Sequence, residues 1–232
     1  MNFLDKVRVL IWKEITSELR AKEMLSSMLV FSLLVVAFFG FALDADNNLV
    51  ARVFPGILWV TLTFAGILGL NRSFVSERQN DCIHGLMLCP VDRSAIYFAK
   101  TVMNLLLMGI VEIVTIPLFF VLFNYSPPVN IGLFIFATFL GTYGFMAVGT
   151  FLSALAANTK SSEVLLPILM IPLIVPALIC TVQVTKVLFM GDISTLSPGS
   201  VDSMWLFLRL LGGYGVIFTV VPVMLFDFLL EV

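Results

Sequence analysis

The chain has 232 residues, of which 60% are hydrophobic and only 12% are charged, and its formal net charge is −2. Because soluble domains are about one-quarter charged, this composition predicts an all-α integral membrane protein with one transmembrane domain over residues 1–232 and no soluble domain. The net charge gives no reason to expect a nucleic-acid partner, and three cysteines do not make a disulfide framework.

Residues 1–24 carry nine charged residues and lack the apolar stretch of a secretory signal. Apolar side chains recur at helical spacing from Phe3 to Leu19, and Trp12 lies near the middle. We expect an interfacial helix that lies on the cytoplasmic leaflet. The alternative is a simple cytoplasmic extension of the first span.

Six apolar runs follow, each near the ~20 residues that are needed to cross a bilayer. These predicted transmembrane helices are Leu25–Leu43, Val53–Leu70, Thr101–Phe123, Ile131–Ala157, Val164–Thr185 and Leu210–Phe226. The sixth is the shortest, and Trp205 and Leu206 are available to extend it. The polar stretch Leu188–Arg209 is expected to be an outer loop.

The distribution of Lys and Arg predicts the orientation. Ten of these 13 residues lie before the first span, in the loop 71–100, or between the fourth and fifth spans. The other side holds only Arg52, Lys186 and Arg209. By the positive-inside rule, both termini and the loop 71–100 are expected to be cytoplasmic.

The loop contains the stretch ERQNDCIHGLMLCPVDRSAIYFAK (77–100), which holds the only histidine, His84, and two cysteines, Cys82 and Cys89. A short helix closed by Pro90 is expected here. In such a helix the two cysteines are roughly 10 Å apart along the axis, and His84 points away from both. Because thiolate–zinc bonds are ~2.3 Å long, we expect no metal site. The segment instead predicts an amphipathic surface that a soluble partner can push.

Glu112 lies at the centre of the third predicted span, where an acid is costly and by default functional. Tyr143, Thr61 and Thr63 are the candidate hydrogen-bond partners. Two roles stay open: a hydrogen bond that packs neighbouring helices, or a place lining the transport path or a dimer interface.

Proline and glycine are concentrated in three other spans. Pro167, Pro172 and Pro176 are expected to bend or break the fifth span, either as ordinary membrane prolines or to accommodate conformational change. Six glycines of the fourth and sixth spans are expected to allow close helix packing. They are Gly141, Gly144, Gly149, Gly212, Gly213 and Gly215.

The stretch ER…GLMLCPVDRSAIYFAK is similar to the loop after the second span in ABC-2-type exporter permeases. That loop reads E-R, then G-[ST]-x-E-x-L-x-x-x-P-V-[SD]-R, then an apolar residue and a Lys entering the third span. LVARVFPGILWVTLTFAGILGLNRSF (49–74) and LLPILMIPLIVPALI (165–179) closely resemble the CcmB family of haem exporter permeases in cytochrome c maturation. The resemblance covers nearly the whole chain. One departure is His84, which stands where the family often has an acid.

This resemblance implies a non-catalytic permease subunit of an ABC transporter, working as a homodimer in the bacterial inner membrane. The implied partners are a CcmA-like ATPase, CcmC-like and CcmD-like membrane proteins, and a CcmE-like haem chaperone. Haem is expected as cargo rather than as a bound cofactor. Whether haem crosses this subunit, or ATP energy releases the loaded chaperone, stays open. The sequence has no Gly-Lys pair and so no P-loop, which agrees with ATP hydrolysis by a partner.

The resemblance of the loop also implies the coupling residues. The candidates for coupling to the ATPase are Glu77, Arg78, His84, Leu86, Met87, Pro90 and Arg93. The candidates for the transport path or dimer interface are Glu112, Pro167, Pro172 and Pro176.

Two other functions are open to this sequence. An ABC-2-type permease for another cargo, such as a lipid or polysaccharide, fits the spans and the coupling loop equally well. An intramembrane protease or haem-attaching enzyme needs paired histidines, Ser/His chemistry or a Trp-rich motif. A single histidine and three dispersed tryptophans argue against that enzyme.

Overall fold

The computed structural model describes residues 3–43, 47–79, 93–157, 162–191 and 196–229, which form helices without any strand. The helices are α1 (Phe3–Ala21), α2 (Glu23–Ala42), α3 (Asn47–Gln79), α5 (Arg93–Leu122), α6 (Ile131–Ala157), α7 (Ser162–Phe189) and α8 (Pro198–Leu229). All but α1 are long and apolar enough to cross a membrane, which confirms the predicted all-α membrane fold with six spans.

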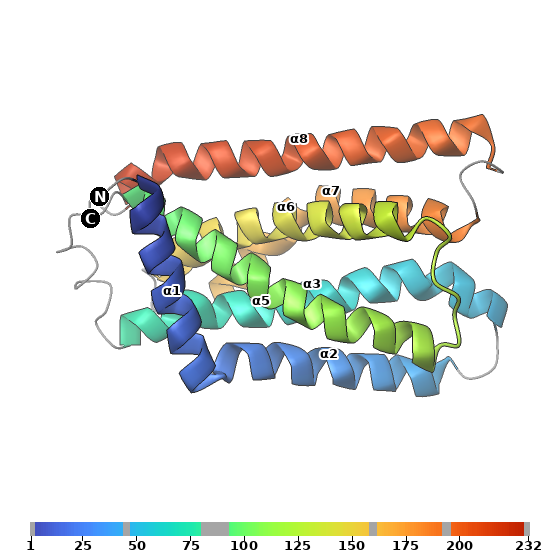
Figure 1. The fold of residues 1–232 in the computed structure, drawn as a ribbon, viewed down its shortest axis with the longest axis horizontal. Coiled ribbons are helices and arrows are strands. Elements are labelled where there is room, and N and C mark those ends of the chain that lie inside the picture. The colour runs from blue at the N-terminus through green and yellow to red at the C-terminus, as the bar shows by residue number, and fades with distance from the viewer. Residues whose placement is uncertain (1–2, 44–46, 80–92, 158–161, 192–195, 230–232) are drawn as a thin grey trace.

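The six long helices run along the length of the molecule, and α1 lies across one end of them (Figure 1). Both chain termini lie at that same end, which we call the α1 end; the opposite end is the far end. An even number of spans returns the chain to its starting side. Large apolar side chains such as Leu34, Ile113 and Val216 are exposed along the spans, as suits a surface that faces lipid or another membrane helix.

A one-residue break separates α1 from α2. Lys22 has a left-handed backbone (φ 53°), and the carboxylate of Glu18 accepts a 2.8 Å hydrogen bond from the backbone N–H of Leu25 in the first turn of α2. The alternative of a simple extension of the first span is therefore wrong, and α1 is a helix of its own. Trp12 is 71% exposed on its outer side, which suits the interfacial position that the sequence predicts.

The expectation of an outer loop over Leu188–Arg209 is wrong, because α8 begins at Pro198. Proline is well tolerated in the first turn of a helix. Met204, Leu208 and Leu211 are buried at helical spacing, so the first three turns of α8 are amphipathic rather than irregular. The polar residues on their exposed side make this stretch look like a loop in the sequence.

Aromatic rings hold the far end together. The ring of Phe54 on α3 contacts rings from α5, from the segment after α5, and from the last turn of α7. The centroid distances are 4.8–6.1 Å. The contacting residues are Phe119, Phe120, Phe123, Tyr125 and Phe189. This cluster fixes three helix ends against one another.

Glycine and tyrosine alternate between α6 and α8. A methyl group built at Gly215 on α8 would lie 2.9 Å from Cε1 of Tyr143 on α6. One built at Gly144 on α6 would lie 3.1 Å from Cδ1 of Tyr214 on α8. A glycine in each helix therefore leaves room for a tyrosine ring of the other helix. This is the close packing that the sequence predicts for these membrane helices.

The other four glycines divide into two pairs. Added methyl groups at Gly141 and Gly149 would overlap side chains of neighbouring helices, so the prediction of close packing is confirmed there. Methyl groups at Gly212 and Gly213 would meet nothing within 4 Å, so within one copy of the chain the prediction is wrong for these two.

Replacing Gly215 by valine is expected to lower the stability of the α6–α8 contact, because the new side chain overlaps the ring of Tyr143. Overpacking of this kind costs about 1–3 kcal/mol. The measurement is the midpoint of thermal unfolding of the purified protein in detergent. Gly213→Val, in the same helix with open space around it, is the matched control. Equal loss of stability in both variants would contradict the packing account.

Candidate functional site

The predicted coupling segment falls between α3 and α5 in the chain, and the end of α3 and the start of α5 both lie at the α1 end (Figure 1). Its residues Cys82, His84, Leu86, Met87, Cys89 and Pro90 lie outside the described residues. Glu77 and Arg78 fall in the last part of α3, and Arg93 is the first residue of α5; the structure describes their backbones alone. The two helices that carry any force from this segment are thus well defined, while the roles of its side chains stay predictions.

A buried lysine lies close to the start of α5. Lys100 is 2% exposed, and its Nζ donates a 3.3 Å hydrogen bond to the backbone carbonyl of Ser73 on α3. The same Nζ lies 3.4 Å from Oε1 of Glu14 on α1. One ammonium group therefore links α1, α3 and α5, at the point where the two helices that flank the coupling segment meet α1.

Lys100 forms part of the wall of a polar pocket of about 140 Å³ between α1, α2, α3 and α5. The charged residues around this pocket are Lys13, Glu14, Glu18, Glu23, Arg72 and Lys100. Acids and bases are equal in number, so the pocket has no net charge that would attract an ion. It is a junction of charged side chains from four helices.

A second ion pair borders the same pocket but is open to water. Arg72 on α3 donates a 3.2 Å hydrogen bond to Glu23 on α2, and the two side chains are 53% and 71% exposed. Exposed pairs of this kind contribute little to stability because solvent screens them. The buried pair Lys100–Glu14 is therefore the stronger candidate for holding the helices together.

Sequence reasoning missed this buried pair. It recognised Lys100 only as the lysine that enters the third span, and it counted Glu14 only among the charges of residues 1–24. The available signal was a lone lysine in an otherwise apolar stretch, AIYFAKTVM. Such a charge needs a partner once it is buried.

Glu112 lies in the second half of α5 and accepts a hydrogen bond from Oγ1 of Thr142 on α6. None of the three expected partners is the donor, so that prediction is wrong. Tyr143 pairs with Thr219 of α8 instead, at 2.6 Å. The hydroxyls of Thr61 and Thr63 donate to backbone carbonyls one turn earlier in α3. These interactions leave Thr142 as the residue that connects α6 to Glu112.

Helix geometry explains why Thr142, and not the expected Tyr143, contacts Glu112. Successive residues of an α-helix point about 100° apart. When Tyr143 faces α8, its neighbour Thr142 faces α5. Of the three expected partners, Tyr143 lies on the helix that provides the donor but at the adjacent position, and Thr61 and Thr63 lie on another helix.

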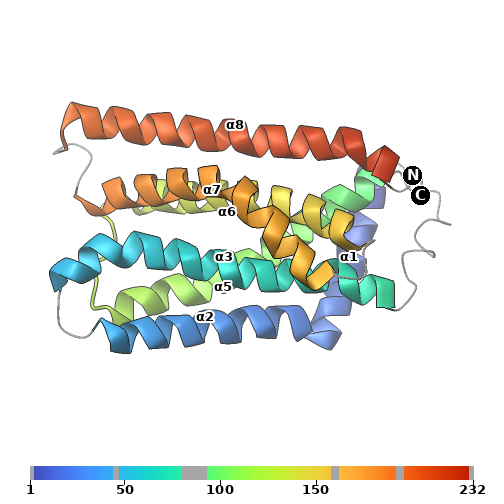
Figure 2. The same ribbon diagram turned by 180° about the vertical axis from the view of Figure 1, so that it is seen from behind.

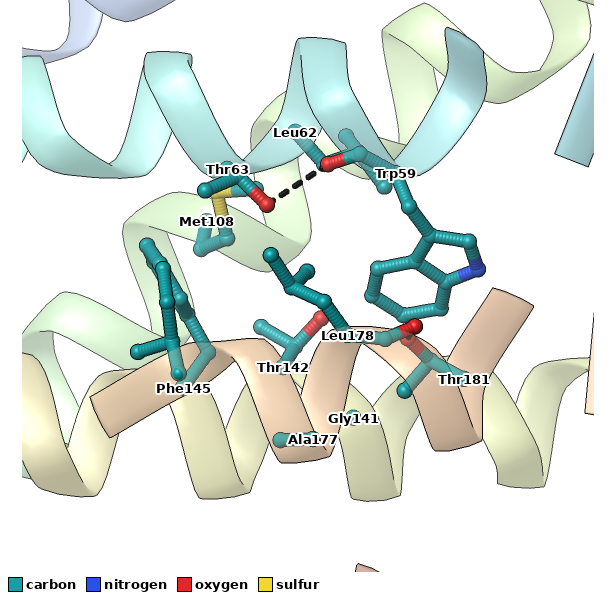
Figure 3. Close-up of a pocket in the computed structure, with 11 residues that line it drawn as sticks. Trp59, Leu62, Thr63, Met108, Gly141, Thr142, Phe145, Ala177, Leu178 and Thr181 are labelled. Atoms are coloured by element: carbon teal, nitrogen blue, oxygen red, sulfur yellow. Dashed lines mark hydrogen bonds between the residues drawn. The ribbon is translucent and has the colours of Figure 1, made fainter. Parts of the chain in front are cut away.

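A small pocket lies beside Thr142, between α3, α5, α6 and α7 (Figure 3). Trp59, Met108 and Phe145 form part of its apolar wall, and its volume is about 10 Å³. A space of that size holds about one water molecule. This pocket has no room for a large planar molecule such as haem.

All three candidate prolines of the fifth span lie inside α7, which continues through them as one helix. Figure 2 shows the amino-terminal part of α7 running obliquely to the rest, so the helix is bent rather than broken. Tyr214 of α8 donates a 2.9 Å hydrogen bond to the carbonyl of Leu173, between Pro172 and Pro176. Both of these prolines are exposed at the surface of the single copy.

The family model described as "CcmB protein" matches residues 5–227. Three similar proteins are each named "Heme exporter protein B". The one from Rhodobacter capsulatus is 29% identical over 180 residues, which cover 78% of this chain and 82% of that protein.

The protein from Haemophilus influenzae is 30% identical over 180 residues, covering 77% of this chain and 79% of its own length. The one from Pseudomonas aeruginosa is 28% identical, with 67% and 69% covered. The family model spans both ends of the bundle and all six candidate spans. The chain therefore belongs to the CcmB protein family.

Proposed function

We propose that this chain is the membrane permease subunit of an ABC transporter that serves haem export and cytochrome c maturation. The observation that carries this proposal is the match of the CcmB family model to residues 5–227. The relatives named "Heme exporter protein B" support haem rather than a lipid or polysaccharide as the substance handled. The six candidate spans support a permease rather than a soluble component.

The chain works with partners that supply ATP hydrolysis. It has no P-loop signature, so a separate ATPase subunit of the CcmA type provides the energy. Two copies of the permease with two copies of the ATPase form the core of the assembly. CcmC-like, CcmD-like and CcmE-like proteins handle haem around it.

The ATPase binds at the α1 end, on the cytoplasmic side of the inner membrane. The excess of Lys and Arg in the segments at this end supports the orientation, since such residues favour the cytoplasmic side. Both termini and the helix ends that flank the coupling segment lie there (Figure 1). The amphipathic helix α1, with Trp12 on its exposed side, lies on the cytoplasmic leaflet.

Glu112 is the functional acid of the membrane interior. It is half-buried on α5, and the adjacent Ile113 is exposed at the surface of one copy. This position allows it to face a second copy or a cargo path between copies while Thr142 holds its carboxyl group. The small volume of the pocket beside Thr142 supports a path between copies over a path through one copy.

Deletion of this gene is expected to abolish holo-cytochrome c while leaving haem synthesis normal, because haem is made but not delivered. Haem-stained gels of periplasmic cytochromes and total haem content are the two measurements. Complementation with the wild-type gene is the control. Normal holo-cytochrome c in the deleted strain would refute the haem assignment.

Leu86→Asp is expected to weaken capture of the ATPase subunit in pull-down experiments, because it replaces an apolar side chain of the predicted coupling helix by a charged one. His84→Glu restores the acid that the family often has there and is expected to retain binding. Ser126→Asp, at the far end, introduces the same charge as a control. Unchanged capture by Leu86→Asp would count against a coupling role for the segment.

Glu112→Gln is expected to lower holo-cytochrome c without loss of complex assembly, because it keeps the shape and the hydrogen bond but removes the ionisable group. Thr142→Val removes the hydroxyl that binds Glu112 and is expected to act in the same direction. Thr138→Val on the same helix removes a hydroxyl that binds only the backbone of Phe134 and is the control. Failure of the Glu112→Gln complex to assemble would assign Glu112 to packing.

A further inference from the structure

We propose that the ion pair between Lys100 and Glu14 makes α1 move together with α3 and α5, so that α1 takes part in coupling. The inference rests on the proposed function, because it assumes that an ATPase acts on the segment between these two helices. Lys100 is a positioning residue here, since it acts through α1 and touches no cargo.

The side chain of Lys100 lies in a buried environment. Its side chain is 2% exposed, and a buried ammonium is tolerated only when charged or polar partners surround it. Oε1 of Glu14 at 3.4 Å and the carbonyl of Ser73 at 3.3 Å are two such partners. Separating α1 from α5 would remove a carboxylate from a buried cation. The two helices are therefore held at one relative position.

Ser73 and Lys100 each lie a short distance along the backbone from a helix end that flanks the coupling segment. Ser73 lies six residues before Gln79, where α3 ends, and Lys100 lies seven residues after Arg93, where α5 begins. At about 1.5 Å per residue, each lies about 10 Å from its helix end. A displacement applied to the helix ends reaches Lys100 from both sides through continuous α-helix.

The junction between α1 and α2 is a break in the helix. The single left-handed residue Lys22 separates the two helices, so the α2 helix does not continue into α1. α1 packs along α5, and Ile15 of α1 contacts the hydrophobic core. The Lys100–Glu14 pair adds a charged attachment to this apolar contact, so α1 follows α5 more closely than it follows α2.

The test compares variants of the pair in the complete membrane complex. In the double variant Lys100→Met/Glu14→Gln both charges are gone, and no buried ion is left without a partner. This variant is expected to bind the ATPase subunit and hydrolyse ATP as the wild type does, but to lose holo-cytochrome c formation. Wild-type levels of holo-cytochrome c in a double variant that assembles would overturn the proposal and leave the pair a structural role only.

The single variants and a control complete this comparison. Lys100→Met leaves Glu14 beside Lys13, whose Nζ lies 3.0 Å away, and is expected to assemble but to lose coupling. Glu14→Gln leaves the buried ammonium short of a carboxylate and is expected to lower assembly as well. Glu23→Gln removes only the exposed pair with Arg72, and both assembly and coupling are expected to stay unchanged.

A second measurement leaves Lys100 and Glu14 unchanged. In a cysteine-free background, spin labels are placed at Trp12 on α1, Val102 on α5 and Phe41 on α2, all of which are exposed. Trapping the complex with nucleotide is expected to leave the Trp12–Val102 distance unchanged and to shift the Trp12–Phe41 distance. A change in the Trp12–Val102 distance, or no change in either, would overturn the proposal.

The two levels of inference fail in different ways. If the deleted strain makes normal holo-cytochrome c, the proposed function fails, whatever the variants do. If deletion abolishes holo-cytochrome c but the double variant supports it, the proposed function stands and only the role of Lys100 and Glu14 fails.

Discussion

A lysine ammonium buried in an apolar helix bundle has to be surrounded by groups that replace water, and this requirement organises the α1 end of the molecule. Lys100 is 2% exposed and meets the requirement with Glu14 of α1 and the backbone carbonyl of Ser73 on α3. A helix that the sequence presents as a surface element is thereby attached to two of the spans. The same two spans carry the segment on which the ATPase is proposed to act.

The rest of the bundle is closely packed, and its contacts combine apolar side chains with hydrogen bonds between helices. Tyrosine rings lie over glycines between α6 and α8, and a group of aromatic rings surrounds Phe54 at the far end. Glu112 is an acid at mid-depth, and it is held by Thr142 of a neighbouring helix. Close packing at mid-depth suits helices that move as rigid bodies.

Much of the fold could be predicted from the sequence, because about 20 apolar residues in a row have few alternatives to a spanning helix. The separate helix α1 follows equally from its periodicity. The start of α8 at Pro198 was missed because an amphipathic helix end resembles a polar loop. The partners of Glu112 and Lys100 were missed for different reasons. Thr142 comes directly before the expected Tyr143, and its side chain points about 100° away from that of Tyr143 around the helix. Glu14 lies 86 positions before Lys100 in the chain, and only the tertiary structure brings the two together.

The proposed coupling requires that the ATPase acts at the α1 end, and site-specific photocrosslinking tests this most directly. A photoreactive amino acid is placed either at position 84, between α3 and α5, or at position 126, at the far end, in membranes that contain the whole complex. Crosslinks to the ATPase subunit are predicted from position 84 and not from position 126. Crosslinks from position 126, or none from position 84, would contradict the proposed orientation and the coupling role together.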